Sequence, residues 1–264
     1  MKNHSIPVML ILFMMLGMII FLFMFLPVIN VILSTSYTDF FTALMNRDVQ
    51  YAIFLSFYTA AVATIAAFVL GTPLAYILAR KDFPFKKFID SIIDIPILLP
   101  HTVAGIALLT LFGERGILGA LFLQFGIRFI DTIFGIIIAQ LFVSAPFYIK
   151  TVRESFEDID PRYHNVARTL GATPSKAFLQ IELPLAFHSI LTGSILCWAR
   201  AISEFGAVII LAYYPPVAPV LIYQQFVLYG LSAALPTTAV LIILTLVIFA
   251  ILKYVQSKSP RGYE

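Results

Sequence analysis

Six stretches without a charged residue restrict what this chain can fold into. No Asp, Glu, Lys or Arg occurs at residues 5–38, 49–79, 95–113, 132–149, 183–199 or 205–252. Only 12% of the 264 residues are charged and 61% are hydrophobic, whereas a typical soluble domain carries about 25% charge. A chain with so little polar surface cannot cover itself as a water-soluble globule. The pattern therefore predicts an all-α polytopic membrane protein.

The lengths of these stretches predict six transmembrane helices in a single domain that covers residues 1–264. A helix needs about 20 apolar residues to cross a hydrocarbon core of about 30 Å. The last stretch is too long for one helix, because it would measure about 72 Å, and Pro215 and Pro216 interrupt it. We interpret it as the end of one span, a loop and a further span. The predicted spans are residues 7–35, 50–79, 88–112, 131–150, 185–212 and 233–255.

The distribution of Lys and Arg predicts that both termini are cytoplasmic. With the N-terminus inside, the inner segments hold thirteen of the 17 Lys and Arg residues, and the outer loops hold Arg47, Arg115 and Arg128. Short loops rich in Lys and Arg stay on the cytoplasmic side of a membrane. The first apolar run is too long for the core of a signal peptide, so we expect it to remain as a span.

The charged segment 151–184 is predicted to form two short helices on the cytoplasmic side. Asp160-Pro161 is typical of a helix start, and Gly171 suits the left-handed residue that follows a helix end. Thr173-Pro174 repeats the start signal. Tyr163, Val166, Ala167 and Leu170 form an apolar stripe at helical spacing. The segment is either a hairpin that packs onto the ends of the spans or a docking element for a soluble partner.

The same segment resembles the signature E-A-A-x-x-x-G-x9-I-x-L-P of permease subunits in binding-protein-dependent ABC importers. Nine residues separate Gly171 from the run Ile181 to Pro184, and Asn165-Val166-Ala167 stands where Glu-Ala-Ala is usual. The resemblance implies that this loop couples the permease to an ATPase subunit. The residues implied in coupling are Tyr163, Asn165, Val166, Ala167, Arg168, Leu170, Gly171, Ala172, Ile181 and Pro184.

Three further segments resemble oxyanion permeases within this family. Residues 95–105 look like their third helix, and residues 199–207 resemble their A-R-A-x-x-E-F-G-A segment. Residues 223–236 are similar to molybdate/tungstate permeases of archaea and bacteria. The resemblance implies a multi-pass protein of the plasma or inner membrane that translocates molybdate or tungstate by alternating access. Sulfate and thiosulfate permeases share parts of these segments and stay as the alternative.

The energy source for such transport must lie outside this chain. None of its 13 glycines is followed by Lys, so the phosphate-binding G-x-x-x-x-G-K-[ST] loop is absent. The resemblance implies two ABC ATPase subunits that bind ATP and magnesium, a second copy of the chain and an extracellular or periplasmic oxyanion-binding protein. We expect no cofactor on this chain. The formal net charge of +3 is too small to suggest nucleic-acid binding. The apolar spans add the lipid bilayer to the expected partners.

Polar residues within the spans are the candidates for a pore or gate. Intramembrane charges are costly and mark functional sites by default, so Arg200 and Glu204, one helical turn apart, stand out. Alternatively, the two only pair with each other and stabilise the fold. Prolines within spans fit a cavity lining, and His101 is expected to be an interhelical hydrogen-bond partner. The pore or gate candidates are Pro100, Thr102, Arg200, Ser203, Glu204 and Gly206.

Two other classes of function are weaker hypotheses. A secondary transporter driven by an ion gradient favours an internal repeat with paired broken helices, and the sequence shows no convincing repeat. An intramembrane aspartyl protease would need paired acids, but Asp90 and Asp94 follow Lys86 and Lys87 at the predicted cytoplasmic surface. The outer loops 113–130 and 213–232 either receive a binding protein or cover the ends of the spans.

Overall fold

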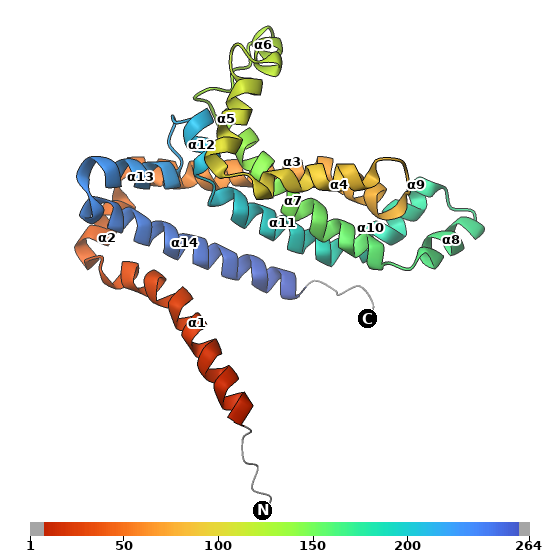
Figure 1. The fold of residues 1–264 in the computed structure, drawn as a ribbon, viewed down its shortest axis with the longest axis horizontal. Coiled ribbons are helices and arrows are strands. Elements are labelled where there is room, and N and C mark those ends of the chain that lie inside the picture. Colours follow the sequence, from red (N-terminus) through yellow and green to blue (C-terminus); the bar gives the residue numbers. More distant parts are fainter. Residues whose placement is uncertain (1–7, 259–264) are drawn as a thin grey trace, which may run out of the picture.

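The computed structural model describes residues 8–258, and within this range the chain consists of helices and their connections (Figure 1). Four helices are long and apolar enough to cross a membrane: α1 (Val8–Leu33), α3 (Arg47–Arg80), α7 (Ile133–Asp158) and α14 (Leu231–Ser257). The others are α2 (Tyr37–Met45), α4 (Lys86–Leu98), α5 (His101–Phe112), α6 (Ile117–Leu123), α8 (Pro161–Thr169), α9 (Pro174–Ala177), the π-helix η1 (Phe178–Glu182), α10 (Leu183–Leu185), α11 (Phe187–Ile202), α12 (Gly206–Leu211) and α13 (Ala218–Tyr229).

Two further candidate spans are broken helices. The chain bends by 114° between α4 and α5, and by 67° between the α9–α10 segment and α11. If each bent pair is one span, the described part of the chain has the six spans that the sequence predicts. An all-helical membrane protein is thereby confirmed, but the shape of two of its spans differs from the prediction.

The predicted span 88–112 is not one straight helix, because the helix breaks at Leu99-Pro100, one of the prolines within the spans. Proline lacks a backbone N–H and disfavours helical geometry in the residue before it. Leu99 accordingly adopts an extended conformation, with φ −74° and ψ 137°. A new helix then starts at His101 in a different direction.

The predicted span 185–212 is also wrong as a single helix. Its first helix ends at Ile202, and α12 starts at Gly206. Polar side chains between them compete with the helical hydrogen-bond ladder. The Ser203 hydroxyl donates to the carbonyl of Arg200 over 3.0 Å, and Glu204 Oε1 accepts from the N–H of Ala207 over 2.8 Å. The carboxylate thus satisfies a backbone group that the break leaves free.

The helix that contains the predicted span 131–150 extends beyond it, because α7 continues to Asp158. Arg153 and Glu157, four residues apart, form an ion pair of 2.7 Å between Nε and Oε1, and such pairs support an exposed helix. Arg153 also pairs with Asp90 of α4. The connection that was predicted to begin at residue 151 therefore begins at Ile159.

Small residues bring the central helices α3, α7 and α11 together. One face of α3 carries Ala60, Ala63, Ala67, Gly71 and Ala75, and all five are buried. Membrane helices commonly associate through such residues, since small side chains let the backbones approach closely. A Cβ atom at Gly71 would lie 3.0 Å from side-chain atoms of two residues of α7. The broken helices α4, α5 and α12 pack against α7 of this central group.

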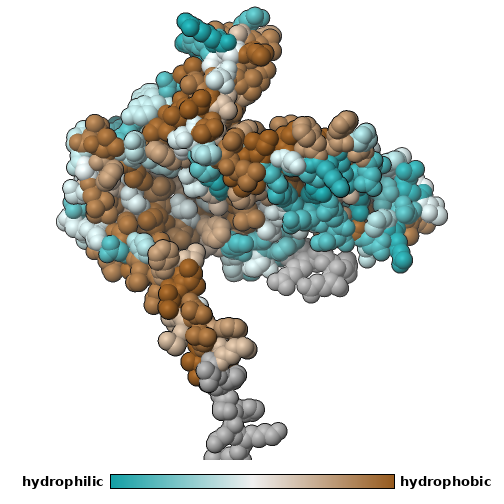
Figure 2. Space-filling view, in the orientation of Figure 1, coloured by the Kyte–Doolittle hydropathy of each residue, from teal (hydrophilic) through white to brown (hydrophobic). Residues whose placement is uncertain are grey.

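The surface of the molecule divides into hydrophobic and hydrophilic regions. Figure 2 shows hydrophilic residues gathered at the end that carries α8 and α9, whereas α1, which projects from the body, is hydrophobic on all visible sides. No part of the most apolar window of α1 is buried. A helix that is apolar all round suits a lipid environment.

We predict that Gly105→Ala destabilises the protein. The added Cβ would lie 2.8 Å from Cβ of Ile210 and 3.0 Å from the backbone of Ala207, and overpacking of this kind costs about 1–3 kcal/mol. The measurement is thermal unfolding in detergent, with Gly17→Ala as the matched control because nothing lies within 4 Å of its Cβ position. Equal melting temperatures for the two variants would contradict close packing between α5 and α12.

Candidate functional site

The two helix breaks meet at a cavity of about 470 Å³. Its lining comes from the start of α5 and from the junction between α11 and α12. Most of the predicted pore or gate residues lie together here, and Pro100 lies beside them at the break itself. The lining residues are His101, Thr102, Arg200, Ser203, Glu204, Phe205 and Gly206.

Glycine at the start of α12 allows the two broken spans to touch. A Cβ atom at Gly206 would lie only 2.6 Å from Cβ of His101 and 3.2 Å from its backbone carbonyl carbon. Any larger residue would push α12 away from α5. The close approach explains why residues about a hundred positions apart in the sequence share one cavity.

Arg200 is held at the cavity by a buried acid and an imidazole. Its Nη2 lies 2.7 Å from Glu204 Oε2 and 3.0 Å from His101 Nε2. The Glu204 side chain is fully buried, while the Arg200 side chain keeps 19% of its surface exposed. The predicted pairing of Arg200 with Glu204 is confirmed by this geometry. The pair places a compensated cation in the lining, and its role as a gate stays a prediction.

His101 has a larger place in this cluster than the sequence suggested. It was expected only as an interhelical hydrogen-bond partner, and it does join α5 to the end of α11. The signal that could have found it is its position directly after Pro100, where a broken helix restarts.

Asp90 and Asp94 pair separately with Arg153 and Lys150 of α7, so they do not form the facing dyad of an aspartyl protease.

Segment 151–184 has the two helix starts and the glycine turn that the sequence predicts, but its second helix passes into the π-helix η1 after Ala177. Asp160 Oδ1 accepts from the N–H of Arg162 over 2.8 Å, and Thr173 Oγ1 accepts from the N–H of Lys176 over 3.3 Å. Gly171 has a φ of +90°, the left-handed conformation expected of a residue that ends a helix. The amphipathic helix α8 is therefore capped at both ends.

Most of the residues of α8 that were predicted to take part in coupling are exposed. The apolar side chains of Tyr163, Val166 and Leu170 are exposed, and Leu170 keeps 83% of its surface. Only Ala167 of the predicted stripe is buried. The stripe therefore does not pack onto the ends of the spans. The other predicted coupling residues differ in exposure. Four are exposed, namely Asn165, Arg168, Gly171 and Pro184, and two are half-buried, namely Ala172 and Ile181.

A buried acid in the same segment escaped the sequence analysis. Glu182, between Ile181 and Pro184 of the signature, is fully buried. It lies 2.9 Å from Arg80 at the end of α3 and 3.0 Å from His164 of α8. The available signal was an acidic residue directly before an apolar span, with a basic residue at the end of another span.

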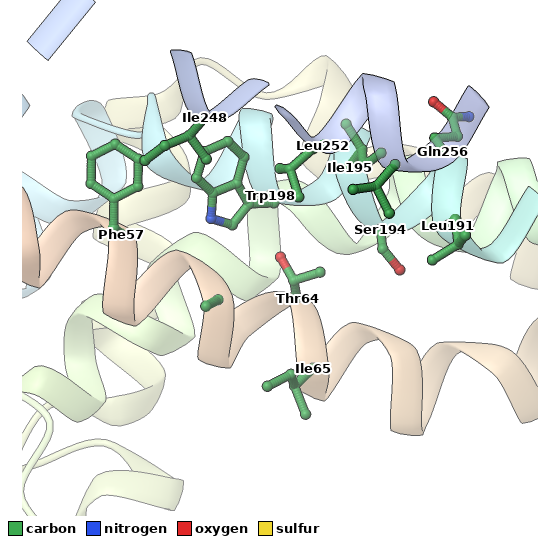
Figure 3. A pocket seen from close by; sticks show the side chains of 12 residues that line it. Phe57, Thr64, Ile65, Leu191, Ser194, Ile195, Trp198, Ile248, Leu252 and Gln256 are labelled. Carbon is green, nitrogen blue, oxygen red and sulfur yellow. The ribbon is translucent and has the colours of Figure 1, made fainter. Parts of the chain in front are cut away.

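A second cavity of about 470 Å³ lies between α3, α11 and α14 (Figure 3). Phe57, Trp198 and Leu252 contribute to its largely apolar wall, and Thr64, Ser194 and Gln256 add uncharged polar groups. None of the described residues that line it is charged. It therefore lacks the positively charged group that Arg200 provides in the cavity at the helix breaks. Within residues 8–258, no cluster of His, Cys, Asp and Glu is placed to hold a metal ion.

Known proteins share both the sequence and the fold of this chain. The molybdate/tungstate transport system permease protein WtpB of Pyrococcus abyssi is 40% identical over 251 residues, which is 94% of this chain and 96% of that protein. WtpB of Thermococcus kodakarensis is 45% identical over 207 residues, 78% of each chain. The sulfate transport system permease protein CysT of Synechocystis is 33% identical over 211 residues, covering 78% of this chain and 74% of CysT.

Solved structures extend the likeness to the fold. A bacterial ABC transporter that imports the acidic polysaccharide alginate matches with a TM-score of 0.74 at 18% identity, over 94% of this chain and 95% of that chain. The sequence model of the binding-protein-dependent transport system inner membrane component matches residues 71–259. In such importers the ATPase activity lies in separate subunits, and the permease subunit is not itself an enzyme. The chain is thus a multi-pass membrane protein of the binding-protein-dependent transport system inner membrane component family.

Proposed function

We propose that this chain is the membrane-spanning subunit of an ATP-driven importer for molybdate or tungstate. The observation that carries the proposal is its 40% identity to a molybdate/tungstate permease over 94% of the chain. The cavity at the helix breaks supports it, because Arg200 and His101 offer the donors that an oxyanion needs. Sulfate is the second candidate, since a sulfate permease is 33% identical over 78% of the chain.

The exposed apolar surface of α8 supports coupling to a separate ATPase. Tyr163, Val166 and Leu170 lie on a helix that is capped at both ends, and such a helix transmits displacement better than an irregular linker. Two copies of this chain would bind two ATPase subunits that carry ATP and magnesium. Closure of the ATPase pair would draw the two α8 helices together and rock the spans between inward-open and outward-open states.

Exposed side chains in the predicted outer loop 113–130 support contact with a binding protein that delivers the anion. The α5–α6 region projects from the body of the molecule (Figure 1), and the side chains of Ile117 and Phe125 are largely exposed there. A structural relative is an alginate ABC transporter in complex with an alginate-bound periplasmic protein. A corresponding oxyanion-binding protein would dock on this side.

Uptake by the assembled complex tests the proposed substrate. The permease, its ATPase and a candidate binding protein are reconstituted in vesicles, with the ATPase and ATP on the inside. Uptake of labelled molybdate, tungstate and sulfate into these vesicles is then measured. We expect ATP-dependent uptake of molybdate and tungstate, and no uptake without ATP. Uptake of sulfate alone would support the second candidate, and uptake driven by an ion gradient without ATP would refute the proposal.

Gly171→Val is expected to uncouple transport from ATP hydrolysis. The φ of +90° is strained for a β-branched residue, although nothing lies within 4 Å of its Cβ position. The substitution therefore changes the path of the chain after α8 without a steric clash. The measurement is the number of ATP molecules hydrolysed per ion taken up. Gly17→Ala is the control, and an unchanged ratio in Gly171→Val would contradict the coupling role of this segment.

Arg200 and Glu204 variants separate stability from gating. Arg200→Gln leaves the buried Glu204 carboxylate without its cation, which costs about 3–5 kcal/mol of stability. We expect the double variant Arg200→Gln, Glu204→Gln to recover most of the melting temperature in detergent but not the uptake of molybdate. A double variant that transports at the wild-type rate would show that the pair serves the fold alone.

A further inference from the structure

Glu182 joins three separate segments at the cytoplasmic end of the molecule. Its carboxylate accepts hydrogen bonds from the Tyr76 hydroxyl over 2.9 Å and from Arg80 Nε over 2.9 Å, both on α3. His164 Nδ1 of α8 lies 3.0 Å from the same carboxylate. Glu182 itself ends the π-helix η1 that leads into α10 and α11. One buried acid thus contacts α3 and α8 directly and lies at the start of the span that contains α11.

The Glu182 carboxylate is surrounded by polar partners, one of which is itself held by aromatic contacts. A buried charge is stable only when it is paired and hydrogen-bonded, and Glu182 has a cation and two further polar partners. Tyr76 also packs edge-on against Phe156 of α7, with ring centroids 5.3 Å apart, and against Phe178 of η1, at 4.7 Å. The aromatic contacts fix the hydrogen-bonding hydroxyl relative to α7 and η1.

Few side chains of α8 reach the rest of the molecule. Ala167 is the one buried residue of α8, and His164 is half-buried with 22% of its side chain exposed. The contact between His164 and Glu182 is therefore the main polar link between α8 and the helices of the body. Besides the chain connections at its two ends and the buried Ala167, this contact is the side-chain link from α8 to Glu182.

We infer that Glu182 is a positioning residue that transmits displacement of α8 to the spans, with His164 as its contact on α8. The inference rests on the proposed coupling of α8 to an ATPase. It adds a specific path, in which the carboxylate moves with His164 and shifts the end of α3 through Arg80. The π-helix fits such a role, because π-helical turns occur frequently at functional sites.

Two substitutions of His164 test this path without removing the buried acid. In His164→Leu, Glu182 keeps Arg80 and Tyr76, so we expect the protein to fold and to bind the ATPase. The number of ions taken up per ATP hydrolysed should fall about tenfold, which lies within the range by which single substitutions change the coupling between two sites. His164→Gln keeps a hydrogen-bond donor for the carboxylate and should retain most of the wild-type ratio.

Glu182→Gln in the same reconstituted complex should also lower the number of ions taken up per ATP hydrolysed. The matched control is Glu154→Gln, because Glu154 lies on the exposed surface of α7. Should Glu182→Gln fail to fold, the His164 pair decides the question. A wild-type ratio in His164→Leu would overturn the inference, and so would loss of the ATPase from that variant, because the contact would then serve docking. Absence of the ATPase from the purified wild-type complex would instead refute the proposed function.

Discussion

The carboxylate of Glu204 meets two requirements that the membrane imposes at the centre of this fold. It neutralises Arg200, and it accepts a hydrogen bond from the backbone N–H of Ala207 where the helix is interrupted. In hydrocarbon an unsatisfied backbone group or an unpaired charge costs several kcal/mol. A span can therefore break in the middle only where such a partner is supplied. The cavity and the approach of α5 to α12 both depend on this break.

A second buried acid, Glu182, has the corresponding place at the cytoplasmic end of the same span. Between the two acids lies α11, which packs against α3 and α7 over its length. One acid contacts Arg80 of α3 and His164 of α8, while the other holds Arg200 beside His101. The predicted coupling segment and the cavity are thus connected by α10 and α11, with a bend between these two helices. Movement at one acid has a short mechanical path to the other.

Local features of the fold were predictable from the sequence, and contacts between distant segments were not. The helix starts at Asp160 and Thr173 and the left-handed Gly171 depend on neighbouring residues alone, so their signals were sufficient. The uncharged stretches likewise predicted the number of spans. The 114° bend at Pro100 depends on what α5 packs against, and the meeting of His101 with Arg200 depends on the whole arrangement. Ser203 and Glu204 mark the second break in the sequence, but they do not show in which direction α12 continues.

The charge balance of the cavity bears on where an importer of this kind selects its ion. Arg200 is compensated by Glu204, so a dianion that enters meets a donor without a large excess of positive charge. Conduction requires binding strong enough for entry and weak enough for release, and a compensated cation satisfies both conditions. The same compensation gives little means to distinguish one tetrahedral dianion from another. Under the proposed function, discrimination between molybdate, tungstate and sulfate would therefore fall to the external binding protein, and the permease would contribute the timing of release.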